Sequence, residues 1–332
     1  MSAPLRLVFL GSDALAIPVL DSIADGPASP ATVVGVYTQP DRPHGRGQRI
    51  EPGAIKQWAE RRGLPVFQPD RLGADDATGV RDRLRADVAL VMAYGLLLKD
   101  EMLSAPRLGT FNVHTSILPR FRGASPIATA VASGVSETGV SFMRLVRKLD
   151  AGPVADSERV PVGPRDTAAD VTSKLAAAAV PLVIRSLRAL EAGTLAPREQ
   201  DESAATYCRR LSKADGALDF SRPARELAAR INGLFPWPGC SVAIGDTPVK
   251  LGLADVEGEG AVGVPGSVLD LDSEAIRIAT GSGVLRLFRL QRPGGRMLPA
   301  TEFLRGFAIP GGTVLPSAPM APLESSQPFP RV

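Results

Sequence analysis

The chain is poor in the residue types that build metal centres and disulfide scaffolds. Its 332 residues include only two cysteines and two histidines. Cys208 and Cys240 are far apart in the sequence and form no CxxC pair. This arrangement argues against a zinc site and against a disulfide framework. We therefore expect no metal ion, and a cytoplasmic protein whose thiols remain reduced.

Long apolar segments are also missing. No apolar run approaches the roughly 20 residues that span a bilayer. The first residues, MSAPLRLVFLGSD, show neither a secretory signal nor a transit-peptide pattern. We therefore expect no membrane partner. The hydrophobic fraction of 44% is ordinary for a globular protein, and the length favours two domains.

Acidic residues are absent from residues 276–300, which carry Arg277, Arg286, Arg289, Arg292 and Arg296. A second acid-poor stretch, RPHGRGQR (42–49), lies in a glycine-rich loop, although the net charge of the chain is only +3. Arginine on turns and strands suits contacts with phosphate groups, which favours a polyanionic partner. A basic surface that is simply solvated gives the same pattern, so charge alone leaves both interpretations open.

The first half of the chain alternates short apolar runs with segments of helical periodicity. The apolar runs are LRLVFLG (5–11), TVVGVYT (32–38), DVALVMAYG (87–95), TFNVH (110–114) and TGVSFMRLV (138–146). Strands that alternate with helices predict an α/β domain with a mostly parallel sheet covered on both faces. Such sheets bind their ligands at the carboxyl ends of the strands.

The second half has a different character. Residues 193–211 have little periodicity and are predicted to be a linker. Residues 212–315 contain short β-like runs separated by glycine turns, which predict a small β-barrel. The proline- and serine-rich residues 316–332 are predicted to be a disordered tail. The first domain is therefore expected to span residues 1–192.

Polar chemistry gathers at the end of one predicted strand, in FNVHTSILPRFRGASPI (111–127). Asn112 and His114 are two residues apart and therefore project from the same face. An amide and an imidazole that converge on one oxygen atom suit the stabilisation of a tetrahedral oxyanion. Asp150 follows the next predicted strand and, if the strands are neighbours, reaches the same edge to orient His114 or to accept a proton. Alternatively, His114 only satisfies a loop carbonyl.

FNVHTSILPRFRGASPI, with TGVSFMRLVRKLDAGPV downstream, resembles the core of the folate-dependent formyltransferases. That family combines N-x-H, a loop of the S-L-L-P type followed by R-x-R-G-A-x-P-I, and a later D-x-G. Further segments are similar to the members that act on initiator methionyl-tRNA: YTQPDRPHGRGQRIEPGAIKQWAERRGLPVFQP (37–69), VMAYGLLL (91–98), TYCRRLSKADGALDF (206–220) and FPWPG (235–239). The resemblance extends from about Leu5 to Leu315.

The resemblance implies a Rossmann-like catalytic domain followed by an OB-like barrel that binds tRNA. It implies formyl transfer from 10-formyltetrahydrofolate to the α-amino group of methionyl-initiator tRNA, for translation initiation. The implied catalytic set is Asn112, His114 and Asp150. The implied folate contacts are Ser116, Ile117, Leu118, Pro119, Met92, Tyr94 and Gly95. The implied tRNA contacts are Arg42, Arg46 and Arg49, to which the acid-free run adds Arg286, Arg289, Arg292 and Arg296. We expect a monomer.

Three other functions compete with this one. The first is a folate-dependent formyltransferase with another acceptor amine, such as an amino sugar nucleotide or a purine precursor. The second is a non-catalytic RNA-binding protein, which would leave Asn112, His114 and Asp150 without a role. The third is a nicotinamide oxidoreductase. Its only support is GEGAVG (258–263), which lies among predicted β-turns rather than between a strand and a helix.

Overall fold

The computed structural model describes residues 3–27, 29–44 and 49–330. The chain forms two compact units. The first comprises residues Met1–Arg122, Gly139–Val160 and Ser173–Ala205, and the second comprises Gly123–Thr138, Pro161–Thr172 and Thr206–Val332. None of the helices within the described ranges is both long and apolar enough to cross a bilayer.

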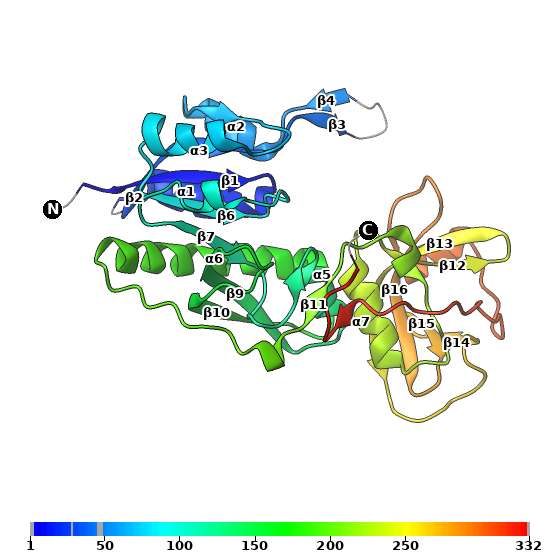
Figure 1. Ribbon diagram of the computed structural model, residues 1–332. Helices are drawn as coiled ribbons and strands as arrows, with labels where there is room; N and C mark the ends of the chain where they lie inside the picture. The colour runs from blue at the N-terminus through cyan, green and yellow to red at the C-terminus, as the bar shows by residue number, and fades with distance from the viewer. Residues whose placement is uncertain (1–2, 28, 45–48, 331–332) are drawn as a thin grey trace. The chain divides into compact units, whose positions relative to one another are not determined.

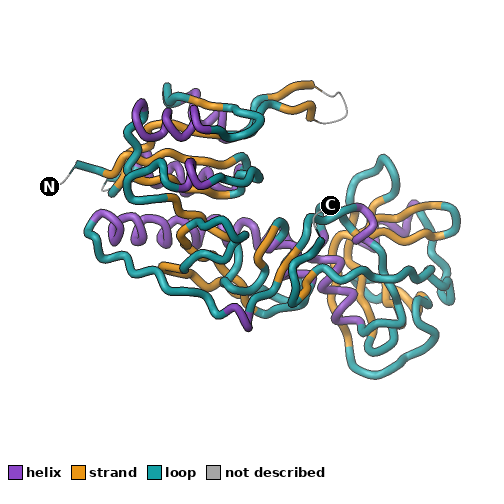
Figure 2. Tube along the Cα trace, viewed as in Figure 1, coloured by secondary structure: helices purple, strands orange, loops and turns teal. Residues whose placement is uncertain are grey.

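The first unit is built on a seven-stranded sheet of order β10-β9-β7-β6-β1-β2-β5 (Figures 1 and 2). The strands are β1 (Leu5–Gly11), β2 (Ala31–Tyr37), β5 (Val66–Phe67), β6 (Val88–Met92), β7 (Thr110–His114), β9 (Glu137–Arg144) and β10 (Val154–Pro161). β2, β1, β6 and β7 pair in parallel, whereas β9 pairs antiparallel with β7. The predicted α/β class with a mostly parallel sheet is confirmed.

Helices pack on this sheet through apolar residues at helical spacing, as in α1, where Val19, Leu20 and Ile23 are buried. The helical elements of the first unit are η1 (Ala14–Ala16), α1 (Ile17–Asp25), α2 (Ala54–Arg61), α3 (Ala74–Thr78), η2 (Gly79–Arg83), α4 (Asp100–Leu103), α6 (Ala168–Glu191) and η3 (Glu202–Ala204). A hairpin of β3 (Arg42–His44) and β4 (Arg49–Glu51) extends beyond the sheet (Figure 1). Every residue of the central strands β6 and β7 is buried, which places the end of β7 inside the protein.

The second unit is an antiparallel β domain with few helices (Figure 2). Its main sheet contains β12 (Cys240–Ile244), β13 (Thr247–Glu257), β14 (Val268–Leu271), β15 (Ile276–Ala279), β16 (Val284–Gln291) and β17 (Leu298–Pro299). A second sheet has the order β18-β11-β8, formed by Glu324–Ser325, Tyr207–Cys208 and Arg122–Gly123. The helical elements are α5 (Pro126–Ala132), η4 (Lys213–Gly216), α7 (Ala224–Leu234) and α8 (Ala300–Gly306). The predicted succession of an α/β domain and a β domain is confirmed.

The carboxy-terminal segment differs from its prediction. Residues 316–332 were expected to be disordered, and this is wrong for the described residues 316–330. Ala318 N donates to Leu218 O (2.8 Å), the Arg230 guanidinium donates to Ala321 O (3.0 Å), and β18 pairs with β11. Leu323 is only 6% exposed, within the apolar core of the unit. A proline-rich segment needs no periodicity to pack in this way, because its carbonyl groups accept hydrogen bonds from the body of the domain. Residues 331–332 lie outside the described residues.

Candidate active site

Asn112 and His114 lie at the carboxyl end of β7, between β6 and β9. Alternation along the strand directs both side chains to the same face, as the spacing predicts. Asn112 is 9% exposed and His114 is 6% exposed. Asp150 is 8% exposed, so the structure holds all three polar side chains in nearly buried positions.

His114 meets a different partner at each ring nitrogen. Its Nδ1 is 3.8 Å from Asp150 Oδ1, and its Nε2 is 2.9 Å from the carbonyl oxygen of Phe121. Because a carbonyl oxygen can only accept, Nε2 carries the hydrogen and donates it. Nδ1 is therefore the nitrogen that faces Asp150. The sequence suggested that His114 either faces Asp150 or satisfies a loop carbonyl. The structure contains both contacts, one at each ring nitrogen.

The route that brings Asp150 to His114 is not the one expected. β9 runs antiparallel to β7, with His114 opposite Ser141 and Phe111 opposite Arg144, so β9 ends away from His114. The loop that follows returns to the site. At its tip Asp150 has a φ of +48°, a left-handed conformation that is uncommon for a residue with a side chain. At Gly152 an added Cβ would lie 1.9 Å from the Arg144 carbonyl oxygen, so glycine alone fits there.

The loop after β7 carries the predicted folate contacts at residues 116–119. Ser116 is fully buried, and its hydroxyl donates to the carbonyl of Arg120 (2.6 Å). Ser141 Oγ donates to Ser116 O (2.8 Å) and accepts from Leu118 N (3.1 Å). Leu118 is 8% exposed, whereas Ile117 and Pro119 are only partly covered. The loop is thus held by its polar groups and presents apolar side chains.

The other predicted folate contacts lie at the end of β6 and in the turn that follows it. Met92 is fully buried, and Tyr94 is 2% exposed within the apolar core beside Tyr37, where burial raises the pKa of its hydroxyl. Gly95 is exposed, with a φ of +77°, and its neighbour Ala93 is also exposed. Met92 and Tyr94 are therefore core residues, and the exposed residues of this turn are Ala93 and Gly95.

The basic residues are distributed unevenly. Arg42 is exposed at the start of β3 and Arg49 begins β4, whereas Arg46 lies outside the described residues. In the second unit, Arg289, Arg292 and Arg296 are exposed, and none of the ion pairs among the described residues involves them.

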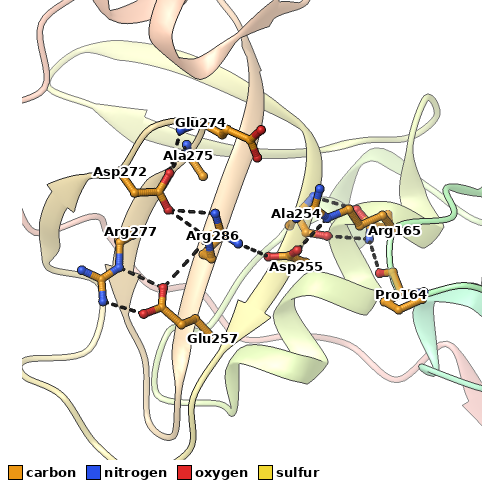
Figure 3. A network of polar contacts seen from close by, with 11 residues as sticks. Pro164, Arg165, Ala254, Asp255, Glu257, Asp272, Glu274, Ala275, Arg277 and Arg286 are labelled. Atoms are coloured by element: carbon orange, nitrogen blue, oxygen red, sulfur yellow. Dashed lines mark hydrogen bonds and ion pairs between the residues drawn. The ribbon is translucent and has the colours of Figure 1, made fainter.

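Arg277 and Arg286 belong to a network of ion pairs with carboxylates of neighbouring strands, and Figure 3 shows its contacts with Asp255, Glu257 and Asp272. Arg286 lies 2.9 Å from an Asp272 oxygen and 3.7 Å from Asp255, and Arg277 lies 2.9 Å from Glu257 and 3.0 Å from Asp270. Strand register explains the order, because Asp255 is opposite Arg286, Arg286 is opposite Arg277, and Arg277 is opposite Asp270. The run that lacks acidic residues in sequence therefore receives carboxylates from neighbouring strands.

Two residues of the site were given no role from the sequence. Phe121 contributes only its backbone carbonyl, which no side-chain pattern can reveal. Arg122 is fully buried, and its guanidinium contacts Gln200 and Glu202. Its position in an R-x-R-G sequence before a predicted helix was the only available signal.

The side chains at the end of β7 can donate to an oxyanion and exchange a proton. Within the described residues, no three histidine, cysteine, aspartate or glutamate side chains are grouped as a metal site. The combination of one amide, one imidazole and one carboxylate suits acyl-type transfer through a tetrahedral intermediate.

Comparison with known proteins gives a consistent result. Residues 5–187 match the formyl transferase family model, and residues 210–308 match the model of the formyl transferase C-terminal domain. The chain is 42% identical to the methionyl-tRNA formyltransferase of Stutzerimonas stutzeri (strain A1501), over 90% of this chain and 93% of that protein. It is 40% identical to the methionyl-tRNA formyltransferase of Pseudomonas syringae pv. tomato, over 95% and 99%.

Solved structures share the fold at low sequence identity. An N-formyltransferase from Helicobacter canadensis, in complex with folinic acid and dTDP-3-aminofucose, has a TM-score of 0.65 at 16% identity, over 85% of this chain and 99% of that chain. HypX from Aquifex aeolicus, in complex with tetrahydrofolic acid, has a TM-score of 0.58 at 17% identity, over 91% of this chain and 47% of that chain. These similarities concern the fold alone.

Proposed function

The chain belongs to the methionyl-tRNA formyltransferases, and from this premise we propose that Asn112, His114 and Asp150 are the groups that carry out the transfer. Its activity is formyl transfer from a folate donor to methionyl-tRNA in translation initiation. We propose 10-formyltetrahydrofolate as the donor, with no metal ion. Because its acceptor is charged initiator tRNA, we also propose that the enzyme works in the cytoplasm. We further propose that it is a monomer.

The acceptor needs little activation. A free α-amino group titrates near pH 8, so about a tenth or more of it is neutral and nucleophilic at pH 7. The enzyme must hold this amine within about 3.5 Å of the formyl carbon and stabilise the oxyanion that forms when the C–N bond forms. The nearly buried donors Asn112 and His114, at the carboxyl end of β7, can both position the reacting groups and stabilise the oxyanion.

His114 can donate to the oxyanion only through Nδ1, because the Phe121 carbonyl occupies its Nε2–H. That donation requires the doubly protonated ring, and the Asp150 carboxylate on the Nδ1 side balances its charge. Asn112 supplies the second donor. Asp150 takes up the proton that the attacking amine loses, directly or through water. His114 or that water then protonates the folate nitrogen as the bond between this nitrogen and the formyl carbon breaks.

For the donor, we propose that the folate lies along the partly covered Ile117 and Pro119 and against the backbone of residues 93–95. The contacts predicted for the Met92 and Tyr94 side chains are not retained, because the protein core covers both. Ser116 and Leu118 contribute by fixing the loop rather than by offering polar side-chain atoms.

The observation that carries this proposal is the 3.8 Å approach of Asp150 to His114 at the end of β7. The experiment that tests it is a transfer assay with labelled formyl-folate and charged initiator tRNA, with an amino sugar nucleotide as the competing acceptor. Asn112→Ala is expected to lower kcat about 100-fold, because one oxyanion donor is lost. An Asn112→Ala variant as fast as the native chain would contradict the assignment.

For tRNA binding, we propose contacts from Arg42 and Arg49 of the β3–β4 hairpin, from Arg46, which lies between them in the sequence, and from Arg289, Arg292 and Arg296. Arg286 is proposed instead as a structural member of the ion-pair network, since its guanidinium is engaged by carboxylates (Figure 3). Phosphate contacts of this kind act far from the reacting amine and carry no sequence information.

This division predicts different salt dependences for arginines of one strand. Arg289→Gln is expected to reduce the slope of log K against log salt by roughly 0.7–0.9, because one fewer counterion is released on binding. Arg286→Gln is the matched control and is expected to leave the slope unchanged. Binding of charged tRNA, measured over a range of salt concentrations, gives both slopes. Equal slopes for the two variants would contradict the proposal that Arg289 binds phosphate whereas Arg286 is held in the ion-pair network.

A further inference from the structure

Gln200 lies beside the loop that carries Asp150. Val154 and Arg198 form an antiparallel bridge, with both backbone hydrogen bonds at 2.8 Å. Continuing this register places Gln200 opposite Gly152. We propose that Gln200, backed by Arg122, is a positioning residue that fixes the Asp150 backbone for its part in formyl transfer. This inference rests on the proposed function, since it requires Asp150 to act in the reaction.

Both ends of the Gln200 amide are used. Its Nε2 donates to the carbonyl oxygens of Asp150 (2.8 Å) and Gly152 (2.7 Å). Its Oε1 accepts from Arg122 Nε (3.2 Å) and Nη2 (2.8 Å). An arginine only donates and a carbonyl only accepts, so the orientation of the amide is determined by its partners. Gln200 therefore links the Asp150 loop to Arg122, and its amide cannot be flipped without losing these hydrogen bonds.

The Asp150 loop needs such support. A φ of +48° lies in the left-handed region, which is disfavoured for residues with a Cβ although less so for aspartate, so contacts with the surroundings help to hold the backbone there. The hydrogen bonds from Gln200 act on the carbonyl of Asp150 itself and on that of Gly152. Rotation of either peptide would move the carboxylate away from His114 Nδ1.

Arg122 gives the support a fixed base. Its side chain is fully buried, and it makes a double contact with Glu202, from Nη1 (3.2 Å) and Nη2 (2.9 Å). Glu202 also accepts from Lys148 Nζ (2.6 Å). The carboxylate balances the buried guanidinium, and the hydrogen bonds from Arg122 and then Lys148 lower the pKa of Glu202 to about 2. The preceding residue, Phe121, holds His114, so two consecutive residues support both ionisable groups of the site.

The test replaces Gln200 by a side chain of similar size that cannot donate. Gln200→Met is expected to lower kcat about 10- to 100-fold, because small displacements of a reacting group cost that much. KM for the folate donor and for charged tRNA should change less than about 2-fold, since Gln200 binds neither. Gln57→Met is the control and should keep a native kcat, because Gln57, on helix α2, also donates to a backbone carbonyl, that of Pro52, but outside the Asp150 loop. A native kcat in Gln200→Met would overturn the inference.

A double variant separates positioning from general damage. If Gln200 acts through Asp150, Gln200→Met should slow Asp150→Asn no further than about 2-fold. A structural defect would instead multiply the two losses, and that outcome also overturns the inference. A slow Asp150→Asn combined with a native Gln200→Met removes the positioning role alone. A native rate in Asp150→Asn would refute the proposed function of Asp150 and the positioning role together.

Discussion

Formyl transfer by His114→Ala is expected to be about 1,000-fold slower than transfer by the native chain. The substitution removes the Nδ1 donor to the oxyanion, and losing such a donor costs about 100- to 1,000-fold. It also removes a partner that Asp150 approaches to 3.8 Å, and with it the relay that returns a proton to the folate nitrogen. The loss should lie in kcat, because His114 is 6% exposed and offers little surface for binding either substrate.

Single-turnover rates at saturating donor and acceptor measure this loss. The affinity of the variant for the folate donor, measured by equilibrium binding, is the control and should be close to native. The Phe121 carbonyl loses its donor in the variant, so thermal unfolding must be recorded alongside. If His114→Ala retained more than about a tenth of the native rate, the imidazole would be only a partner of the Phe121 carbonyl.

The half of the site that lies on one strand could be predicted from the sequence. Asn112 and His114 share a face because side chains alternate along any strand. Their location at a carboxyl end follows from the alternation of strands and helices, which indicates a parallel sheet. No tertiary information is needed for either step, since both depend on local periodicity.

Asp150 was predicted correctly as a neighbour of His114, but for the wrong reason. A strand–helix–strand segment is typical of parallel pairing, yet β9 runs antiparallel to β7. The return of the chain depends on a left-handed residue at Asp150 and on the close approach of Gly152 to Arg144 O. The same loop is also bound by Gln200, far along the chain, which donates to the Asp150 and Gly152 carbonyls, and no local pattern reveals such a contact.

Charge was the property that the sequence described least well. Residues 276–300 contain no acidic residue, but strand pairing places Asp255 opposite Arg286 and Asp270 opposite Arg277. Register is fixed by the packing of whole strands and not by the charges themselves. Of the arginines in this run, only Arg289, Arg292 and Arg296 are exposed and outside the ion pairs of the described residues, as expected for a basic surface.

The carboxy-terminal segment, residues 316–330, is expected to contribute strongly to the stability of the second unit. Leu323→Ala is expected to lower the free energy of unfolding by about 3 kcal/mol, or about 150-fold in the folding equilibrium. Leu323 is 6% exposed and packs into the same core as the strands of the second unit. The neighbouring Arg230 is 5% exposed and donates to Ala321 O, so a loosened segment would also leave a buried guanidinium without one acceptor.

Substitution is a cleaner test than deletion of the segment. Deletion would remove the contacts but also the cost of ordering about 15 residues, roughly 1–2 kcal/mol each, and these opposing amounts obscure the result. Val314→Ala, at a position 58% exposed, is the matched control and should change stability by less than about 0.5 kcal/mol. Urea unfolding with an unchanged m-value measures both differences. Equal midpoints for the two variants would mean that the segment does not pack on the domain in solution, because Leu323 would then cost no more to truncate than the exposed Val314.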